Sequence, residues 1–106
     1  MAARRATRTN LLRRLEADSL IEPGVRLDPE SFTNAAHRFL ACTQSGLAMA
    51  QLDDLTGEAD QVNVPGATSE YPNWRRRLSA TLDEIAASKS LDDLAEIFAA
   101  ERGCHA

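Results

Sequence analysis

The sequence predicts a small, mostly helical unit of residues 1–106, in which residues 47–52 are the one candidate β-strand that would make it α/β. Apolar residues recur at helical spacing near both ends of the chain, whereas a long stretch between them has no regular period. Hydrophobic residues make up 43% of the chain and charged residues 26%, as in globular proteins. This composition excludes wholesale disorder.

Residues 4–20 are predicted to form an amphipathic helix whose apolar side holds Leu11, Leu12, Leu15 and Ala17. Arginines occupy the rest of its surface. A charge run of this kind indicates a solvated face, with an RNA-binding face as the alternative. The arginines concerned are Arg4, Arg5, Arg8, Arg13 and Arg14.

A second helix is predicted to begin after Asp28, a good N-cap, with Pro29 in the first helical position. Apolar residues then follow at helical spacing, and residues 43–46 end the pattern. His37 lies between apolar neighbours in this helix. We expect it to be a partly exposed structural histidine.

Residues 47–52 read Leu-Ala-Met-Ala-Gln-Leu, and two interpretations remain open for them. Residue propensities favour a helix. A short apolar run bounded by Ser-Gly and by acids is equally typical of a buried parallel strand.

Residues 58–80 have neither helical nor strand periodicity, and Pro65-Gly66 is a turn signal within them. Asn73 is predicted to cap a short helical turn that begins at Trp74. Two short helices should follow, one over residues 81–87 and one with Ser90 as its N-cap.

The net charge of −4 argues against a general nucleic-acid or membrane-surface binder. The charge is uneven, with seven Arg against five acids in residues 1–40 and five basic residues against eleven acids afterwards. Cys42 and Cys104 have no CxxC partner, so we expect free thiols and no zinc site. No apolar run is long enough to span a membrane, and the cytoplasm is the expected location.

Catalytic motifs are sparse. Asp53 and Asp54 are adjacent, so their side chains point in different directions and they make a poor general acid–base pair. Other oxygen ligands with metal-site spacing are absent from the sequence around them. We expect these acids to be solvated or paired with the arginines of residues 75–77. The sequence contains no nucleophile motif and no phosphate-binding glycine loop.

The stretch QVNVPGATSEYPNWRRRL, residues 61–78, supports three interpretations. The aromatic residues and the Arg triplet could grip a nucleic-acid strand. Trp74 could instead anchor the loop to a core. Finally, the loop could bind sugar: Asn63 both donates and accepts hydrogen bonds, and Pro65-Gly66 would let the backbone approach a ligand.

This stretch resembles a string found near the C-terminus of 4-α-glucanotransferases (glycoside hydrolase family 77), of the form QVNxPGTxxEyPNWRRRL. The preceding LAMAQLDDLTGE is similar to the family element LxLxQLEDLxGE. The resemblance covers nearly the whole chain but only about the last fifth of a typical family member. This sequence departs from the pattern at Asp53, Thr56 and Ala67.

The resemblance implies that the chain is the C-terminal segment of a (β/α)8 TIM barrel, with residues 47–52 as its last strand. It places residues 63–68 on the glucan-binding face, with Asn63, Pro65 and Gly66 as the substrate-binding residues. Tyr71, Pro72, Trp74 and Arg75 are then expected to anchor the loop. Family members use an Asp nucleophile, a Glu acid/base and a second Asp that stabilises the transition state, in a retaining mechanism without a cofactor.

All of these carboxylates lie upstream of the matching region, so the resemblance assigns no catalytic residue to this chain. We expect a fragment that closes the barrel and supplies part of a sugar-binding wall. Its partners would be the upstream barrel portion and, through the full enzyme, α-glucans or maltooligosaccharides. Nucleic acid and membrane are not expected partners. The alternative is a stand-alone helical interaction module that binds RNA through residues 4–14 and 75–77.

Overall fold

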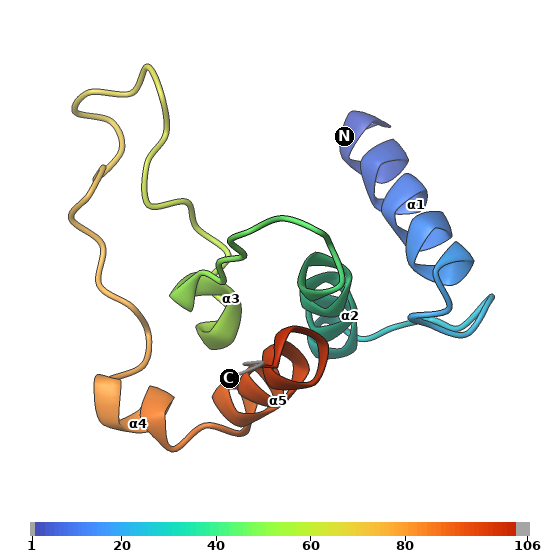
Figure 1. Cartoon of the computed structure of the whole chain (residues 1–106). Helices are drawn as coiled ribbons and strands as arrows, with labels where there is room; N and C mark the ends of the chain where they lie inside the picture. Colours follow the sequence, from blue (N-terminus) through green and yellow to red (C-terminus); the bar gives the residue numbers. More distant parts are fainter. Residues whose placement is uncertain (1, 104–106) are drawn as a thin grey trace. The chain divides into compact units, whose positions relative to one another are not determined.

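A computed structural model describes residues 2–103 of the chain (Figure 1). Its helices are α1 (Ala2–Ala17), α2 (Pro29–Ala41), α3 (Leu52–Thr56), α4 (Leu82–Ala86) and α5 (Lys89–Arg102). The described residues form two compact units. The first joins the residues up to Ala48 with those from Asp93 onward, and the second comprises residues 49–92.

In the first unit, α1 confirms the predicted N-terminal helix, although the helix ends at Ala17 rather than at residue 20. Leu15 is fully buried and forms the centre of its apolar side, but Ala17 is exposed. The helix ends because Ser19 adopts a left-handed conformation with φ 58°. The Leu20 amide then donates to the Leu15 carbonyl oxygen.

Helix α2 begins as predicted. The Asp28 carboxylate accepts a hydrogen bond from the Ser31 amide at 2.9 Å, and Pro29 is the first helical residue. The expectation that His37 is partly exposed is wrong, because its exposed fraction is 5%. Its Nδ1 lies 2.9 Å from the Thr33 carbonyl oxygen, and its ring is inclined by 60° to the ring of Phe98 of α5, with the centroids 6.4 Å apart. The contact with α5 therefore covers a residue that the sequence of α2 alone predicts to be partly exposed.

The last turn of α5 fixes the chain that leaves α2. The Arg102 guanidinium donates to the Thr43 carbonyl oxygen at 3.0 Å and to the Ser45 carbonyl oxygen at 2.8 Å. Ile97 and Leu94 of the same helix are buried. A charged group that satisfies two carbonyl groups of an irregular segment holds that segment in place.

The predicted strand at residues 47–52 does not form in this chain. Residues 47–51 are neither strand nor helix, and α3 begins at Leu52. Leu47 and Met49 are 86% and 83% exposed. A strand needs hydrogen-bonding partners on a neighbouring strand, and residues 2–103 contain no strand of any kind. The helix that propensity favours over this whole run is also wrong, apart from its last residue.

The second unit contains α3, α4 and the first turn of α5. Gly57 ends α3 in a left-handed conformation with φ 68°, and its amide donates to the Asp53 carbonyl oxygen. The predicted helix over residues 81–87 is confirmed as α4, with a complete capping box between Thr81 and Glu84. The cap that the sequence predicts for α5 lies too late in the chain. The hydroxyl cap is that of Ser88, which accepts from the Leu91 amide at 3.2 Å.

None of the helices described in residues 2–103 combines the length and the apolar character that a membrane span requires.

Candidate functional site

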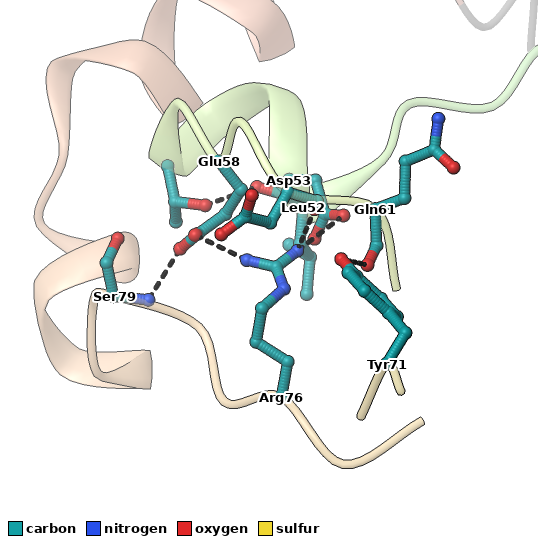
Figure 2. Close-up of polar contacts among 9 residues, drawn as sticks. Leu52, Asp53, Glu58, Gln61, Tyr71, Arg76 and Ser79 are labelled. Carbon is teal, nitrogen blue, oxygen red and sulfur yellow. Dashed lines mark hydrogen bonds and ion pairs between the residues drawn. The ribbon is translucent and has the colours of Figure 1, made fainter. Parts of the chain in front are cut away.

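The irregular residues 61–75 of the second unit form a loop whose two limbs are hydrogen-bonded to each other. The Trp74 amide donates to the Val62 carbonyl oxygen at 3.0 Å. Next to this bond, the Tyr71 hydroxyl donates to the Gln61 carbonyl oxygen at 2.5 Å (Figure 2). The loop therefore has a defined shape although it contains neither helix nor strand.

The side chain of Asn73 closes this loop from inside. Its Oδ1 accepts from the Val64 amide at 2.8 Å, and its Nδ2 donates to the Ala67 carbonyl oxygen at 2.9 Å and more weakly to that of Val64. These bonds bracket the Pro65-Gly66 turn, where Gly66 has φ 85° and the Ala67 amide donates to the Val64 carbonyl oxygen. One amide side chain thus satisfies both ends of the turn. These three hydrogen bonds of the Asn73 side chain are called the clasp below. Asn73 therefore closes the loop and is not the helix cap that the sequence predicts.

Glu70 stiffens the part of the loop that follows the turn, residues 68–70. Its carboxylate accepts from the Thr68 amide at 3.0 Å and the Ser69 amide at 2.8 Å. Backbone amides that point at this carboxylate, its own first, lower the pKa of Glu70 below its usual value.

Arg76 ties the base of the loop to α3 and the residues after it (Figure 2). Its guanidinium donates to the Glu58 carboxylate at 2.6 Å, to the Asp53 carboxylate at 3.4 Å and to the Asp60 carbonyl oxygen at 2.5 Å. The expectation that the Arg triplet pairs with local acids is confirmed for this arginine. Arg76 is well covered, whereas Arg75 and Arg77 are exposed.

Glu58 links the same cluster to the chain that leads into α4. It accepts from the Ser79 amide at 2.5 Å as well as from Arg76 (Figure 2). The Ser79 amide, followed by its hydroxyl and by the Arg76 charge, lowers the pKa of Glu58. Because Arg76 occupies the Asp53 carboxylate, the acidic turn at α3 is a structural ion-pair site. No group of three or more potential metal-ligating side chains occurs within the described part of the chain.

The structure places the predicted substrate-binding residues in one loop, with Pro65 and Gly66 on its turn and Asn63 just before it. Asn63 is half-buried, and Pro65 and Gly66 are exposed at the tip. Asn63 lies between Val62 and Val64, whose backbone groups bond to Trp74 and Asn73 on the other limb.

The expected anchors behave differently from one another. Tyr71 joins the two limbs through its hydroxyl, but Pro72, Trp74 and Arg75 are exposed. Trp74 has 76% of its surface exposed and a left-handed backbone with φ 60°, so it does not pack beneath the loop here. Polar bonds from Asn73 and Arg76 hold the loop instead, because no apolar core covers the indole in this structure.

Sequence reasoning missed Glu58, and it missed the part that Asn73 plays in closing the loop. A signal for Glu58 exists, since it directly follows Gly57, the residue type that ends a helix and redirects the chain. Asn73 offers no comparable signal. Its partners are six and nine residues away, and only the folded loop brings them together.

Acid is expected to loosen this loop. The carboxylates of Glu58 and Glu70 have pKa values below the 4.5 of an unperturbed glutamate, so the unfolded chain binds protons more readily than the folded one. Their contribution to stability is therefore complete above pH 4.5 and is lost as the pH falls through the lower folded-state values. Backbone amide NMR titration checks this, and the midpoints at which the Ser79 and Ser69 signals move should lie below the 4.5 of an unperturbed glutamate.

The variant Glu58→Gln provides the control for this titration. It removes the ionisable group opposite the Ser79 amide and leaves Glu70 in place. The Ser79 signal should then stop titrating while the Ser69 signal still does. Titration of both signals at the pH of an unperturbed glutamate would show that these hydrogen bonds do not form.

Comparison with known proteins matches this chain to one family. The sequence model of the 4-alpha-glucanotransferase family matches residues 2–83. The chain is 34% identical over 98 residues to the 4-alpha-glucanotransferase of Mycobacterium tuberculosis H37Rv, a match that covers 87% of this chain and 14% of that protein. It is 30% identical over 87 residues to the 4-alpha-glucanotransferase of Haemophilus influenzae Rd, covering 76% and 12%.

The chain thus spans 14% and 12% of the length of these two relatives. No solved structure matches it. The family match extends over most of the chain and includes both the ion-pair cluster at Arg76 and the loop that Asn73 closes. The chain belongs to the 4-alpha-glucanotransferase family.

Proposed function

We propose that this chain is the C-terminal part of a 4-α-glucanotransferase, which transfers α-1,4-glucan segments between maltooligosaccharides by a retaining mechanism. The observation that carries this proposal is the family match over residues 2–83. In the complete enzyme the chain closes the (β/α)8 barrel and supplies part of the wall that binds the sugar. The catalytic carboxylates come from the upstream portion of the enzyme, and this upstream portion is the partner of the chain.

If the chain closes the barrel, residues 47–52 form the last strand of the barrel in the complete enzyme. Two features of the segment support this role. Leu47 and Met49 are exposed large apolar residues, which are costly to leave in water. The segment 47–51 is also free of helix, so its backbone can pair with neighbouring strands without first unfolding.

The loop supplies the sugar wall. Asn63 is the residue that we assign to hydrogen bonding with vicinal hydroxyl groups, because an amide both donates and accepts. Pro65 and Gly66 are exposed at the turn, where the backbone can come close to a ligand. The clasp by Asn73 fixes this turn before any ligand binds, which lowers the entropy cost of binding.

We place the enzyme in the cytoplasm.

A chimera tests this function. The segment of the M. tuberculosis relative that aligns with this chain is replaced by residues 1–106, and a matched truncated enzyme lacks the segment altogether. The chimera is expected to convert maltotriose into glucose and longer oligomers, and the truncated enzyme is expected to be inactive. This chain alone should also be inactive.

Two outcomes would contradict parts of the proposal. Disproportionation of maltotriose by the chain alone would show that it carries its own catalytic residues. A folded chimera without activity would show that the segment does not complete the catalytic barrel. Hydrogen exchange offers a second readout, since the amides of residues 47–52 should become protected in the chimera and exchange rapidly in the isolated chain.

A further inference from the structure

Trp74 is the most conspicuous residue that the assigned roles leave unexplained. It is the only tryptophan of the chain, and 76% of its surface is exposed. Tryptophan is highly buried on average in soluble domains, so an exposed indole on an ordered loop is informative.

The backbone at Trp74 is also unusual. Its φ of 60° lies in the left-handed region, which glycine adopts easily but bulky residues rarely do. Such a conformation costs free energy and persists only where the surroundings impose it. The Trp74 amide bonds to the Val62 carbonyl oxygen, the adjacent Asn73 side chain is fixed by its own bonds, and the Arg75 amide bonds to the Pro72 carbonyl oxygen. Strained residues held in this way are concentrated at ligand-binding positions.

The same bonds bring Trp74 next to the polar part of the site. Val62 and Val64 flank Asn63, and they are the residues whose backbone groups bond to Trp74 and Asn73. Trp74 and Asn63, which carry an indole and a primary amide, therefore lie on opposite limbs of one loop. A pyranose ring has C–H groups on its face and hydroxyl groups at its edge. The negative face of an aromatic ring attracts the C–H groups, and an amide binds the hydroxyl groups.

We infer that the indole of Trp74 is a stacking platform for a glucose ring of an α-1,4-glucan, with Asn63 binding the hydroxyl edge of the same ring. This inference rests on the proposed function for the class of substrate. It assigns Trp74 a binding role in place of the anchoring role that its sequence position indicates. The hydrogen bonds of the loop fix the backbone that carries the indole before the glucan arrives.

The single tryptophan makes the test specific, because all tryptophan emission of the 106-residue chain comes from Trp74. Titration with maltoheptaose should produce a saturable change in this emission, whereas the β-1,4-linked cellohexaose should produce none. Asn63→Ala should weaken the apparent affinity by roughly 3- to 10-fold, the effect of losing one ordinary hydrogen bond. No response to maltoheptaose, or an equal response to both sugars, would overturn the inference.

Experiments on the chimera distinguish this inference from the proposed function. They also distinguish glucan binding at Trp74 from burial of Trp74 by the upstream portion of the enzyme. Activity of the unsubstituted chimera tests the function alone. In that chimera, Trp74→Ala should leave a folded enzyme with a raised KM for maltotriose, and Trp74→Phe, which keeps an aromatic face, should raise KM less. A Trp74→Ala chimera that fails to fold would overturn the inference by showing that the upstream portion covers the indole. An unchanged KM in a folded Trp74→Ala chimera would equally overturn the platform.

Discussion

Replacement of Arg76 by alanine is expected to release the base of the loop. The guanidinium joins the base of the loop to α3 and the residues after it, through Glu58, Asp53 and the Asp60 carbonyl oxygen. Hydrogen bonds that involve a charged group are stronger than neutral ones, and their loss here also leaves two carboxylates without the cation between them. Amide exchange at Ser79, which donates to Glu58, should accelerate by roughly tenfold or more.

The Arg triplet contains its own controls. Arg75→Ala and Arg77→Ala remove the same charge from exposed neighbouring positions and should leave exchange at Ser79 almost unchanged. Arg76→Lys keeps the charge but replaces a planar fork with a single ammonium, so it should rescue only part of the protection. Equal effects of all three alanine variants would indicate that net charge, and not the geometry at Arg76, controls this region.

The sequence alone is sufficient for the elements whose cause is local. Asp28 with Pro29 predicts the start of α2, and the residues around Thr81 predict α4, because capping depends on side chains within one turn. The pairing of Arg76 with acids follows from opposite charges alone, although Glu58 and Asp53 lie 18 and 23 residues before it.

Other features depend on contacts between distant residues, and for these the local pattern fails. His37 is buried because Phe98 of α5, far away in the sequence, packs on it. Residues 47–51 form no strand because a strand requires a partner that residues 2–103 do not supply. The sequence places Trp74 beneath the loop, yet the polar bonds of Asn73 hold the loop and leave the indole exposed.

Asn73→Ala is the second substitution with a large expected effect. It removes the acceptor of the Val64 amide and the donor to the Ala67 carbonyl oxygen, both of which are partly buried. Leaving such groups unsatisfied costs about 1–3 kcal/mol, so the loop should open at lower urea concentration than in the parent chain. Trp74 is the adjacent residue and the only tryptophan, so its emission during urea titration measures this opening directly.

Asn63→Ala is the matched control, because it removes the same amide group from the other limb of the same loop. Asn63 makes none of the clasp bonds that Asn73 makes, so the control should change stability by less than about 0.5 kcal/mol. In the chimera the two variants should have different kinds of effect. Asn63→Ala should weaken glucan binding on an intact loop, whereas Asn73→Ala should reduce activity together with loop protection. If Asn73→Ala were as stable as Asn63→Ala, the loop would owe its shape to something other than this clasp, and the rigid presentation of Asn63 and Trp74 would lose its physical basis.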